Sequence, residues 1–155
     1  MRILFVCLGN ICRSPIAEGV LRKLVVEEGL SGWTIDSAGT NQWHKGGPAD
    51  PRSEAVCREN GVDISGHIAR RFRHSDFSAY DRIYSLASDV TDEIAEFSKS
   101  PAEMERVLNF MDLLPGLALR SVPDPWYGGE EGFRDCFALI ERGCRALIEK
   151  TKTRK

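Results

Sequence analysis

A cysteine and an arginine near the N-terminus are the residues of this 155-residue chain whose types and spacing most directly suggest chemistry. Cys7 and Arg13 stand six positions apart, at the two ends of a short polar loop. An apolar run, residues 2–6, precedes the loop, and a helical pattern follows it. Gly9 and Asn10 tolerate a curled backbone, whose N–H groups then point inward and can hold an anion. The segment therefore predicts an anion-binding loop with a thiol at its floor.

The helix expected after this loop strengthens the preference for an anion. Pro15 suits the first position of a helix, which makes Ser14 the expected N-cap. A helix N-terminus carries partial positive charge, and the Arg13 guanidinium offers two parallel donors to a phosphate. The same charges favour the nucleophilic thiolate of Cys7, with the Ser14 hydroxyl as a candidate donor to the sulfur. An unreactive cysteine at the end of a buried strand is the alternative for Cys7.

Composition and charge exclude several classes of function. The formal net charge is −2, so no basic surplus indicates a nucleic acid or an anionic membrane as a partner. The apolar runs are too short to span a bilayer and the start of the chain lacks a signal-peptide pattern, which predicts a cytoplasmic protein. The five cysteines include no C-x2-C pair, so neither a zinc site nor a disulfide framework is indicated. We expect no metal and no cofactor.

Alternating strand and helix patterns predict an α/β fold with one domain over residues 1–155. Strands are expected at residues 2–6, 33–37, 81–86 and 107–110, and helices at residues 16–28, 52–60, 89–98 and 130–149. A strand–helix–strand order favours a parallel sheet, so we expect four parallel strands with helices on both faces. The phosphate-binding loop would follow strand 1, where such sheets bind ligands.

Two motifs together resemble those of the low-molecular-weight protein tyrosine phosphatases. The first is Cys-x5-Arg-Ser, filled by Leu-Gly-Asn-Ile-Cys and followed by Pro-x-Ala-Glu; the second begins at Asp124 with Asp-Pro-Trp-Tyr. The resemblance covers essentially the whole chain. It implies hydrolysis of phosphotyrosine through a cysteinyl-phosphate intermediate, with Cys7 as nucleophile, Arg13 holding the phosphoryl oxygens, and Asp124 as general acid and then base. An Asp-Pro pair without the first motif would more often be only a turn.

The resemblance also implies roles for the residues around the nucleophile. The phosphate-binding residues would be Leu8, Gly9, Asn10, Ile11, Cys12, Arg13 and Ser14. A supporting hydrogen-bond network would join Asn10, Ser14, Ser37 and His67, although a purely structural role for His67 is the alternative. Cys12 would form a reversible disulfide with Cys7 that protects the nucleophile from irreversible oxidation, or would only fill space in the loop.

Aromatic residues near the expected acid suggest the substrate class. Trp126 and Tyr127 follow Asp124, and Trp43 stands in a polar loop with His44. Aromatic walls suit a phenyl ring and keep a short phosphoserine from reaching the nucleophile, whereas packing onto the core is the alternative for these side chains. His44 and His74 are otherwise expected at the surface.

The residue at position 11 refines this expectation through the resemblance. Ile11 stands where the family's protein-arginine phosphatases carry Thr, which favours phosphotyrosine. The expected partners are tyrosine-phosphorylated proteins, tyrosine kinases among them, with phosphate or other oxyanions in the active site.

Three other functions share parts of this pattern. Arsenate reductases use a similar loop but need further cysteines near residues 80–90, where this chain has none. Phosphocysteine carriers lack an acid–base Asp in a second motif, and a non-catalytic phosphotyrosine-binding relative is disfavoured because Cys7, Arg13 and Asp124 are all present. Ala87 stands where many relatives carry Asp. This chain therefore has no carboxylate at that position to support the site.

Overall fold

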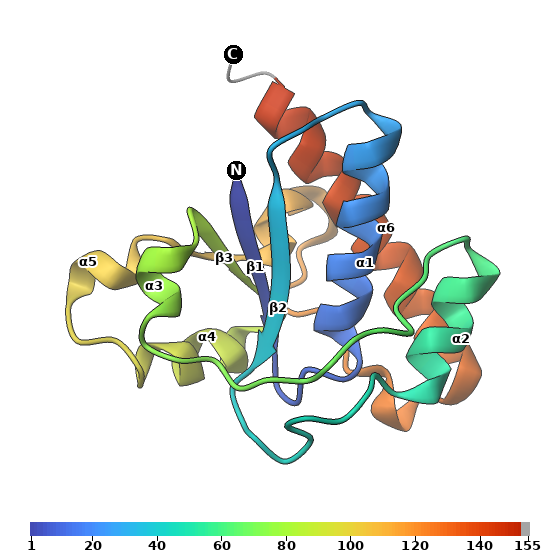
Figure 1. Ribbon diagram of the computed structural model, residues 1–155, viewed down its shortest axis with the longest axis horizontal. Coiled ribbons are helices and arrows are strands. Elements are labelled where there is room, and N and C mark those ends of the chain that lie inside the picture. The colour runs from blue at the N-terminus through green and yellow to red at the C-terminus, as the bar shows by residue number, and fades with distance from the viewer. Residues whose placement is uncertain (153–155) are drawn as a thin grey trace.

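Four parallel strands form one sheet in the order β2-β1-β3-β4 (Figure 1). The computed structural model describes residues 1–152. The strands are β1 (Arg2–Cys7), β2 (Thr34–Gly39), β3 (Arg82–Ser85) and β4 (Val107–Asn109). The strand order reverses at β1, whose last residue is Cys7, and ligands of open α/β sheets bind beside such a reversal. The predicted fold class, an α/β domain built on a four-stranded parallel sheet, is confirmed.

Helices cover both faces of the sheet (Figure 1). One face carries α1 (Arg13–Glu27), α2 (Pro51–Glu59) and α6 (Gly129–Lys152), and the other carries α3 (Asp76–Ala79), α4 (Ser88–Ala95) and α5 (Pro101–Met104). Three short 3-10 turns connect β4 to α6, namely η1 (Phe110–Leu113), η2 (Pro115–Leu117) and η3 (Pro125–Tyr127).

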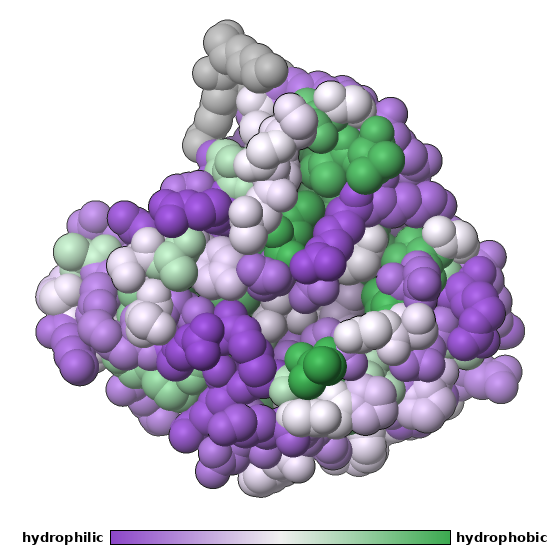
Figure 2. Space-filling model, in the orientation of Figure 1, coloured by the Kyte–Doolittle hydropathy of each residue, from purple (hydrophilic) through white to green (hydrophobic). Residues whose placement is uncertain are grey.

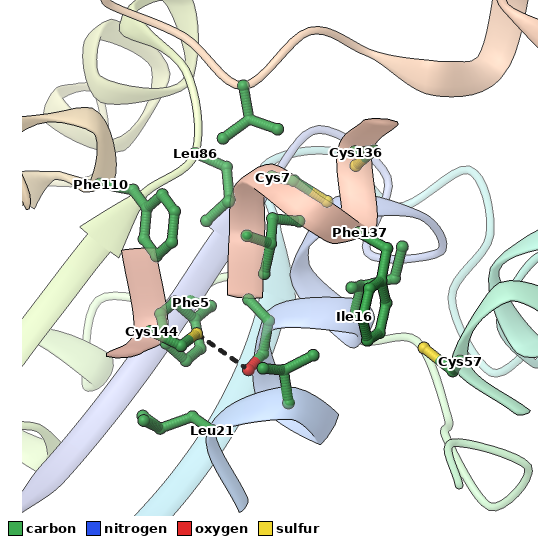
Figure 3. Close-up of a cluster of buried hydrophobic side chains, with 14 of the residues drawn as sticks. Phe5, Cys7, Ile16, Leu21, Cys57, Leu86, Phe110, Cys136, Phe137 and Cys144 are labelled. Carbon is green, nitrogen blue, oxygen red and sulfur yellow. Dashed lines mark hydrogen bonds between the residues drawn. The ribbon is translucent and has the colours of Figure 1, made fainter. Parts of the chain in front are cut away.

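The alternation of side chains along β1 decides which way Cys7 points. Ile3, Phe5 and Cys7 enter the apolar cluster under α1 and α6, whereas Leu4 and Val6 enter the cluster under α3 and α4. All five side chains are almost completely buried, and the four aliphatic or aromatic ones each contribute about 1.5–3 kcal/mol by leaving water. Figure 3 shows Cys7 in the first cluster beside α6. The expected nucleophile is therefore held by a rigid strand at the edge of the core.

The start of α1 differs from the prediction. The helix begins at Arg13, two residues early, so Pro15 is its third residue and Cys12 takes the N-cap position without a side-chain cap. The prediction of Ser14 as N-cap is therefore wrong, because the Ser14 hydroxyl contacts the Cys7 sulfur instead. The other end agrees with the sequence: Gly29 has a positive φ of 68°, and the N–H of Leu30 closes the helix onto the carbonyl of Val25.

The predicted strands and longer helices are all present, with ends shifted by a few residues. The short helices α3 and α5 were not predicted, because four residues are too few to show a helical period. Within residues 1–152, no helix combines the length and the apolar character that crossing a membrane requires. Figure 2 shows polar side chains over most of the face it presents, with the apolar side chains in separate small patches.

Candidate active site

The loop between β1 and α1 curls tightly around the end of the strand. Its sharpest point is Asn10, which adopts a left-handed conformation with φ of 58°. Cys7 is 2% exposed, and Asn10 and Ser14 are completely buried. A buried left-handed residue other than glycine needs side-chain partners to hold it, and Asn10 has several.

The side-chain amide of Asn10 joins the loop to its surroundings. Its oxygen accepts a hydrogen bond from the backbone N–H of Arg70 at 2.9 Å. Because a backbone N–H can only donate, the amide atom that faces it must be the accepting oxygen and not the NH2 group, which fixes the amide orientation. The amide nitrogen then donates to the hydroxyls of Ser14 at 2.8 Å and Ser37 at 2.9 Å. The Ser37 hydroxyl in turn donates a hydrogen bond to the Glu18 carboxylate at 2.8 Å.

These contacts determine what the Ser14 hydroxyl can do for Cys7. The Ser14 oxygen lies 2.9 Å from the Cys7 sulfur. Since that oxygen already accepts from Asn10, its single hydrogen is available to donate to the sulfur. Such a donor stabilises the thiolate relative to the thiol.

His67 also belongs to this network. Its Nε2 lies 2.7 Å from the backbone oxygen of Asn10. The structure thus brings together the four residues expected to support the loop, Asn10, Ser14, Ser37 and His67. The contacts of Glu18 and Arg70 were not predicted, because neither residue belongs to a motif and both reach the loop through the tertiary fold.

Arg13 faces the same space as Cys7 and is 5% exposed. Its Nη1 donates to the backbone oxygen of Val122 at 2.9 Å, which fixes the guanidinium plane. Its Nε is buried and has no hydrogen-bond partner among residues 1–152. Its Nη2 lies 3.8 Å from the Asp124 carboxylate. The edge formed by Nε and Nη2 therefore offers two donors to the cleft, and Nε has no acceptor within residues 1–152.

Asp124 lies at the start of η3, with a proline on each side. Its carboxylate accepts from the backbone N–H of Trp126 at 3.0 Å and caps this turn. The side chain is 37% exposed and lines the same cleft as Cys7 and Arg13. The second motif therefore meets the first in space.

The cleft above Cys7 has a volume of about 210 Å³. Trp43, Trp126 and Tyr127 line it as predicted from the sequence, and Trp43 and Tyr127 are 81% and 90% exposed. These two rings stand at the rim of the cleft and leave much of their surface accessible to a ligand. Packing onto the core does not account for them.

Two further residues line the cleft and were not predicted to do so. His44 is exposed, as expected, but its ring also lies close to that of Trp126, with the ring centroids 6.2 Å apart. Asn41 is the other. Both belong to the loop that carries Trp43, and the position of that tryptophan is the only feature of the sequence that could have indicated them.

Cys12 is buried in the same loop, and all five cysteines are free thiols. Burial raises the pKa of Cys12 to about 12, and the negative charges of Asp50 and other nearby groups add to this shift. Cys12 is therefore a neutral thiol at neutral pH, in the resting geometry.

The family model for low molecular weight phosphotyrosine protein phosphatase matches residues 2–155. The low molecular weight phosphotyrosine protein phosphatase of Schizosaccharomyces pombe is 41% identical over 142 residues, which cover 90% of each chain. A protein tyrosine phosphatase of Entamoeba histolytica, solved with Hepes in its active site, superimposes with a TM-score of 0.92 at 36% identity, covering 99% of this chain and 97% of its own.

A structure with a different activity in its name is similar as well. The Drosophila arginine phosphatase superimposes with a TM-score of 0.91 at 28% identity, covering 98% of each chain. The overall fold therefore does not separate the two substrate classes, and the residues of the cleft must do so.

Proposed function

Because the chain belongs to the low molecular weight phosphotyrosine protein phosphatase family and is a protein tyrosine phosphatase, we propose that Cys7, Arg13 and Asp124 carry out its reaction. The observation that supports this assignment is that one cleft is lined by all three residues, although Asp124 comes from the far end of the chain. The cleft also has exposed aromatic side chains at its rim.

Cys7 acts as the nucleophile. The Ser14 hydroxyl donates to its sulfur and the N-terminus of α1 lies beside it, and both favour the thiolate. The thiolate attacks phosphorus, the bond from phosphorus to the tyrosine oxygen breaks, and a cysteinyl-phosphate forms. Splitting hydrolysis into two steps in this way lowers the barrier of each.

Arg13 and the loop N–H groups hold the phosphoryl oxygens. With Nη1 committed to Val122, the edge formed by Nε and Nη2 faces the phosphate, and its geometry matches two phosphate oxygens. Nε has no other partner in the described part of the chain, and Nη2 lies 3.8 Å from the Asp124 carboxylate. The backbone N–H groups of residues 8–12 curl around the same anion. These donors stabilise the charge that spreads over the equatorial oxygens in the transition state.

Asp124 acts first as the general acid and then as the general base. It protonates the leaving tyrosine oxygen in the first step. It then takes a proton from the water that attacks the cysteinyl-phosphate and releases phosphate. Such a group typically contributes about 10²–10⁴-fold to the rate.

Phosphotyrosine fits the cleft better than phosphoarginine does. Ile11 is an apolar wall of the cleft and offers no polar group to a guanidinium, whereas Trp43 and Trp126 offer ring faces to a phenyl group. The substrates are tyrosine-phosphorylated proteins, tyrosine kinases among them. A reduced nucleophilic thiol is maintained in a reducing compartment, which agrees with the cytoplasmic location predicted from the sequence.

Cys12 serves as the resolving thiol when Cys7 is oxidised. Its place in the same loop, five positions after Cys7 and lining the same cleft, supports this role. The resulting disulfide would protect Cys7 from irreversible oxidation.

The proposal is tested by comparing peptides that carry phosphotyrosine, phosphoarginine or phosphoserine, with Cys7→Ser as the control. Phosphate release is expected from the phosphotyrosine peptide above all, and Cys7→Ser should abolish turnover while still binding phosphate. A preference for phosphoarginine would overturn the substrate assignment. A single stoichiometric release of p-nitrophenol from p-nitrophenyl phosphate, without further turnover, would indicate a phosphocysteine carrier instead.

A further inference from the structure

Arg52, a side chain of helix α2, contacts the loop that carries Asp124. The Nη1 of Arg52 donates to the backbone oxygen of Trp126 at 3.2 Å, and the guanidinium carbon lies 5.2 Å from the centroid of the Trp126 ring. Trp126 in turn donates its backbone N–H to the Asp124 carboxylate at 3.0 Å. Arg52 therefore holds the residue that orients the expected acid.

Arg52 is itself fixed on its other side. Its Nε and Nη2 donate to the two carboxylate oxygens of Asp50 at 3.1 Å and 3.0 Å, and the guanidinium lies 4.6 Å from the centroid of the Phe133 ring at the start of α6. A bidentate pair of this kind sets the orientation of the guanidinium as well as its position. Because the orientation of its guanidinium is fixed, Arg52 can hold the backbone carbonyl of Trp126 in one place.

Asp50 connects this pair to the phosphate-binding loop. The Asp50 side chain is 6% exposed, and its backbone N–H donates to the carbonyl oxygen of Ile11 at 2.9 Å. A continuous series of contacts thus runs from the floor of the cleft to the acid, through Ile11, Asp50, Arg52, Trp126 and Asp124. The contacts join the two sides that must lie at a fixed distance when the nucleophile and the acid act on one phosphate.

We propose that Arg52 is a positioning residue for catalysis. It holds the Asp124 loop in the position from which the carboxyl group reaches the leaving oxygen. This inference rests on the proposed role of Asp124. A displacement of about 1 Å can cost on the order of 10²-fold in rate, so a contact outside the cleft can matter as much as one inside it. Arg52 itself does not line the cleft.

The role predicts a specific kinetic pattern for Arg52→Met. Methionine keeps an unbranched apolar stem against Phe133 and leaves the Asp50 cap on the backbone N–H of Arg52 intact, so α2 should persist. Loss of the guanidinium releases the Trp126 carbonyl. We expect kcat/KM for phosphotyrosine to fall about 10–100-fold, the range in which a displaced general acid loses its effect. For p-nitrophenyl phosphate, whose leaving group needs little protonation, the change should stay within about threefold.

Two companion variants separate positioning from charge and from folding. Arg58→Met removes the same charge from the same helix at a site beside Asp63 and away from the Asp124 loop, and should behave as wild type. Arg52→Lys keeps the charge but cannot hold Asp50 and Trp126 with one planar group, so it should recover only part of the loss. If Arg52→Met does not fold, as judged by thermal melting, Arg52→Lys still gives the leaving-group pattern.

A double variant decides whether Arg52 acts through Asp124. In the Asp124→Ala background, Arg52→Met should cause no further loss, because the group that it positions is absent. If the losses in kcat/KM of the two single variants multiply in the double variant, or if Arg52→Met causes an equal loss for all leaving groups, the inference is overturned. If Asp124→Ala alone leaves the leaving-group dependence unchanged, the proposed acid is wrong and the inference falls with it. If Asp124→Ala shows the dependence and Arg52→Met does not, only the inference fails.

Discussion

The carboxylate of Asp124 lies 3.8 Å from the guanidinium of Arg13, the first residue of α1. The same guanidinium donates to the backbone oxygen of Val122, two residues before Asp124. Arg13 therefore does two things: it faces the cleft beside Cys7, and it fixes the segment that leads to Asp124. These two contacts of Arg13, with Val122 and Asp124, hold the two motifs together although they lie at opposite ends of the chain.

Removing Asp124, the proposed general acid, should lower the rate by a factor that depends on the leaving group. Asp124→Ala is expected to lower kcat/KM about 10²–10⁴-fold for phosphotyrosine, whose phenolate is a poor leaving group, and much less for p-nitrophenyl phosphate. Steady-state kinetics on a series of aryl phosphates measures this dependence. Asp112→Ala is a matched control, since that carboxylate is exposed and pairs with Arg120. Equal losses across the series would mean that Asp124 is not the acid.

The sequence predicts the parts of the site that lie within motifs. The two motifs predict Cys7, Arg13 and Asp124 as site residues, and the family resemblance predicts the network of Asn10 and Ser37. Their spatial arrangement follows from the parallel sheet, since the loop after the central strand must lie at its carboxyl edge.

The residues that sequence analysis missed reach the site through tertiary contacts alone. Arg52 touches a carbonyl 74 positions away, and His44 meets Trp126 across the cleft. Neither contact leaves a period or a spacing in the sequence. Ser14 was wrongly expected to cap α1, because capping preferences consider only the local helix and not the nearby sulfur of Cys7.

Loss of the Ser14 hydroxyl should weaken the nucleophile. Hydrogen bonds to charged groups contribute about 1.5–3 kcal/mol, so Ser14→Ala should lower kcat/KM by about 10–100-fold. The rate of Cys7 alkylation by iodoacetamide at neutral pH should fall with it, because the thiolate is less favoured. Ser78→Ala is the control, since the Ser78 hydroxyl is exposed, donates to the backbone oxygen of Ser75 and does not line the cleft. Unchanged alkylation in Ser14→Ala would contradict a role in stabilising the thiolate.

Close packing of α6 against η1 makes one glycine essential for stability. A Cβ added to Gly143 would overlap the ring of Phe110, which is fully buried against Phe5 and Tyr84. We expect Gly143→Ala to destabilise the fold by about 1–3 kcal/mol in urea denaturation, because overpacking outweighs the gain in helix propensity.

A second substitution reverses the sign of this effect. In the Phe110→Leu background the smaller side chain leaves room for a methyl group, so Gly143→Ala should then raise the free energy of unfolding. Gly132→Ala, on the same helix but with contacts of 3.5 Å or more, should not destabilise the wild type. Destabilisation by Gly143→Ala of equal size in both backgrounds would show that the ring of Phe110 is not the cause.

The pKa of Cys12 should make its protection of Cys7 depend on pH. Peroxide oxidises the Cys7 thiolate to a sulfenic acid; the Cys12 thiolate then attacks that sulfur, an S–S bond forms and hydroxide leaves. Because burial and nearby negative charge raise the pKa of Cys12 to about 12, the attacking thiolate is scarce at neutral pH and grows about tenfold for each unit of pH below that value. Mass spectrometry after mild peroxide treatment should therefore find the Cys7–Cys12 disulfide increasing from pH 7 to pH 9, at the expense of Cys7 sulfinic acid. Cys12→Ser should give sulfinic acid at every pH, and a wild type that forms sulfinic acid without any disulfide would refute the protective role.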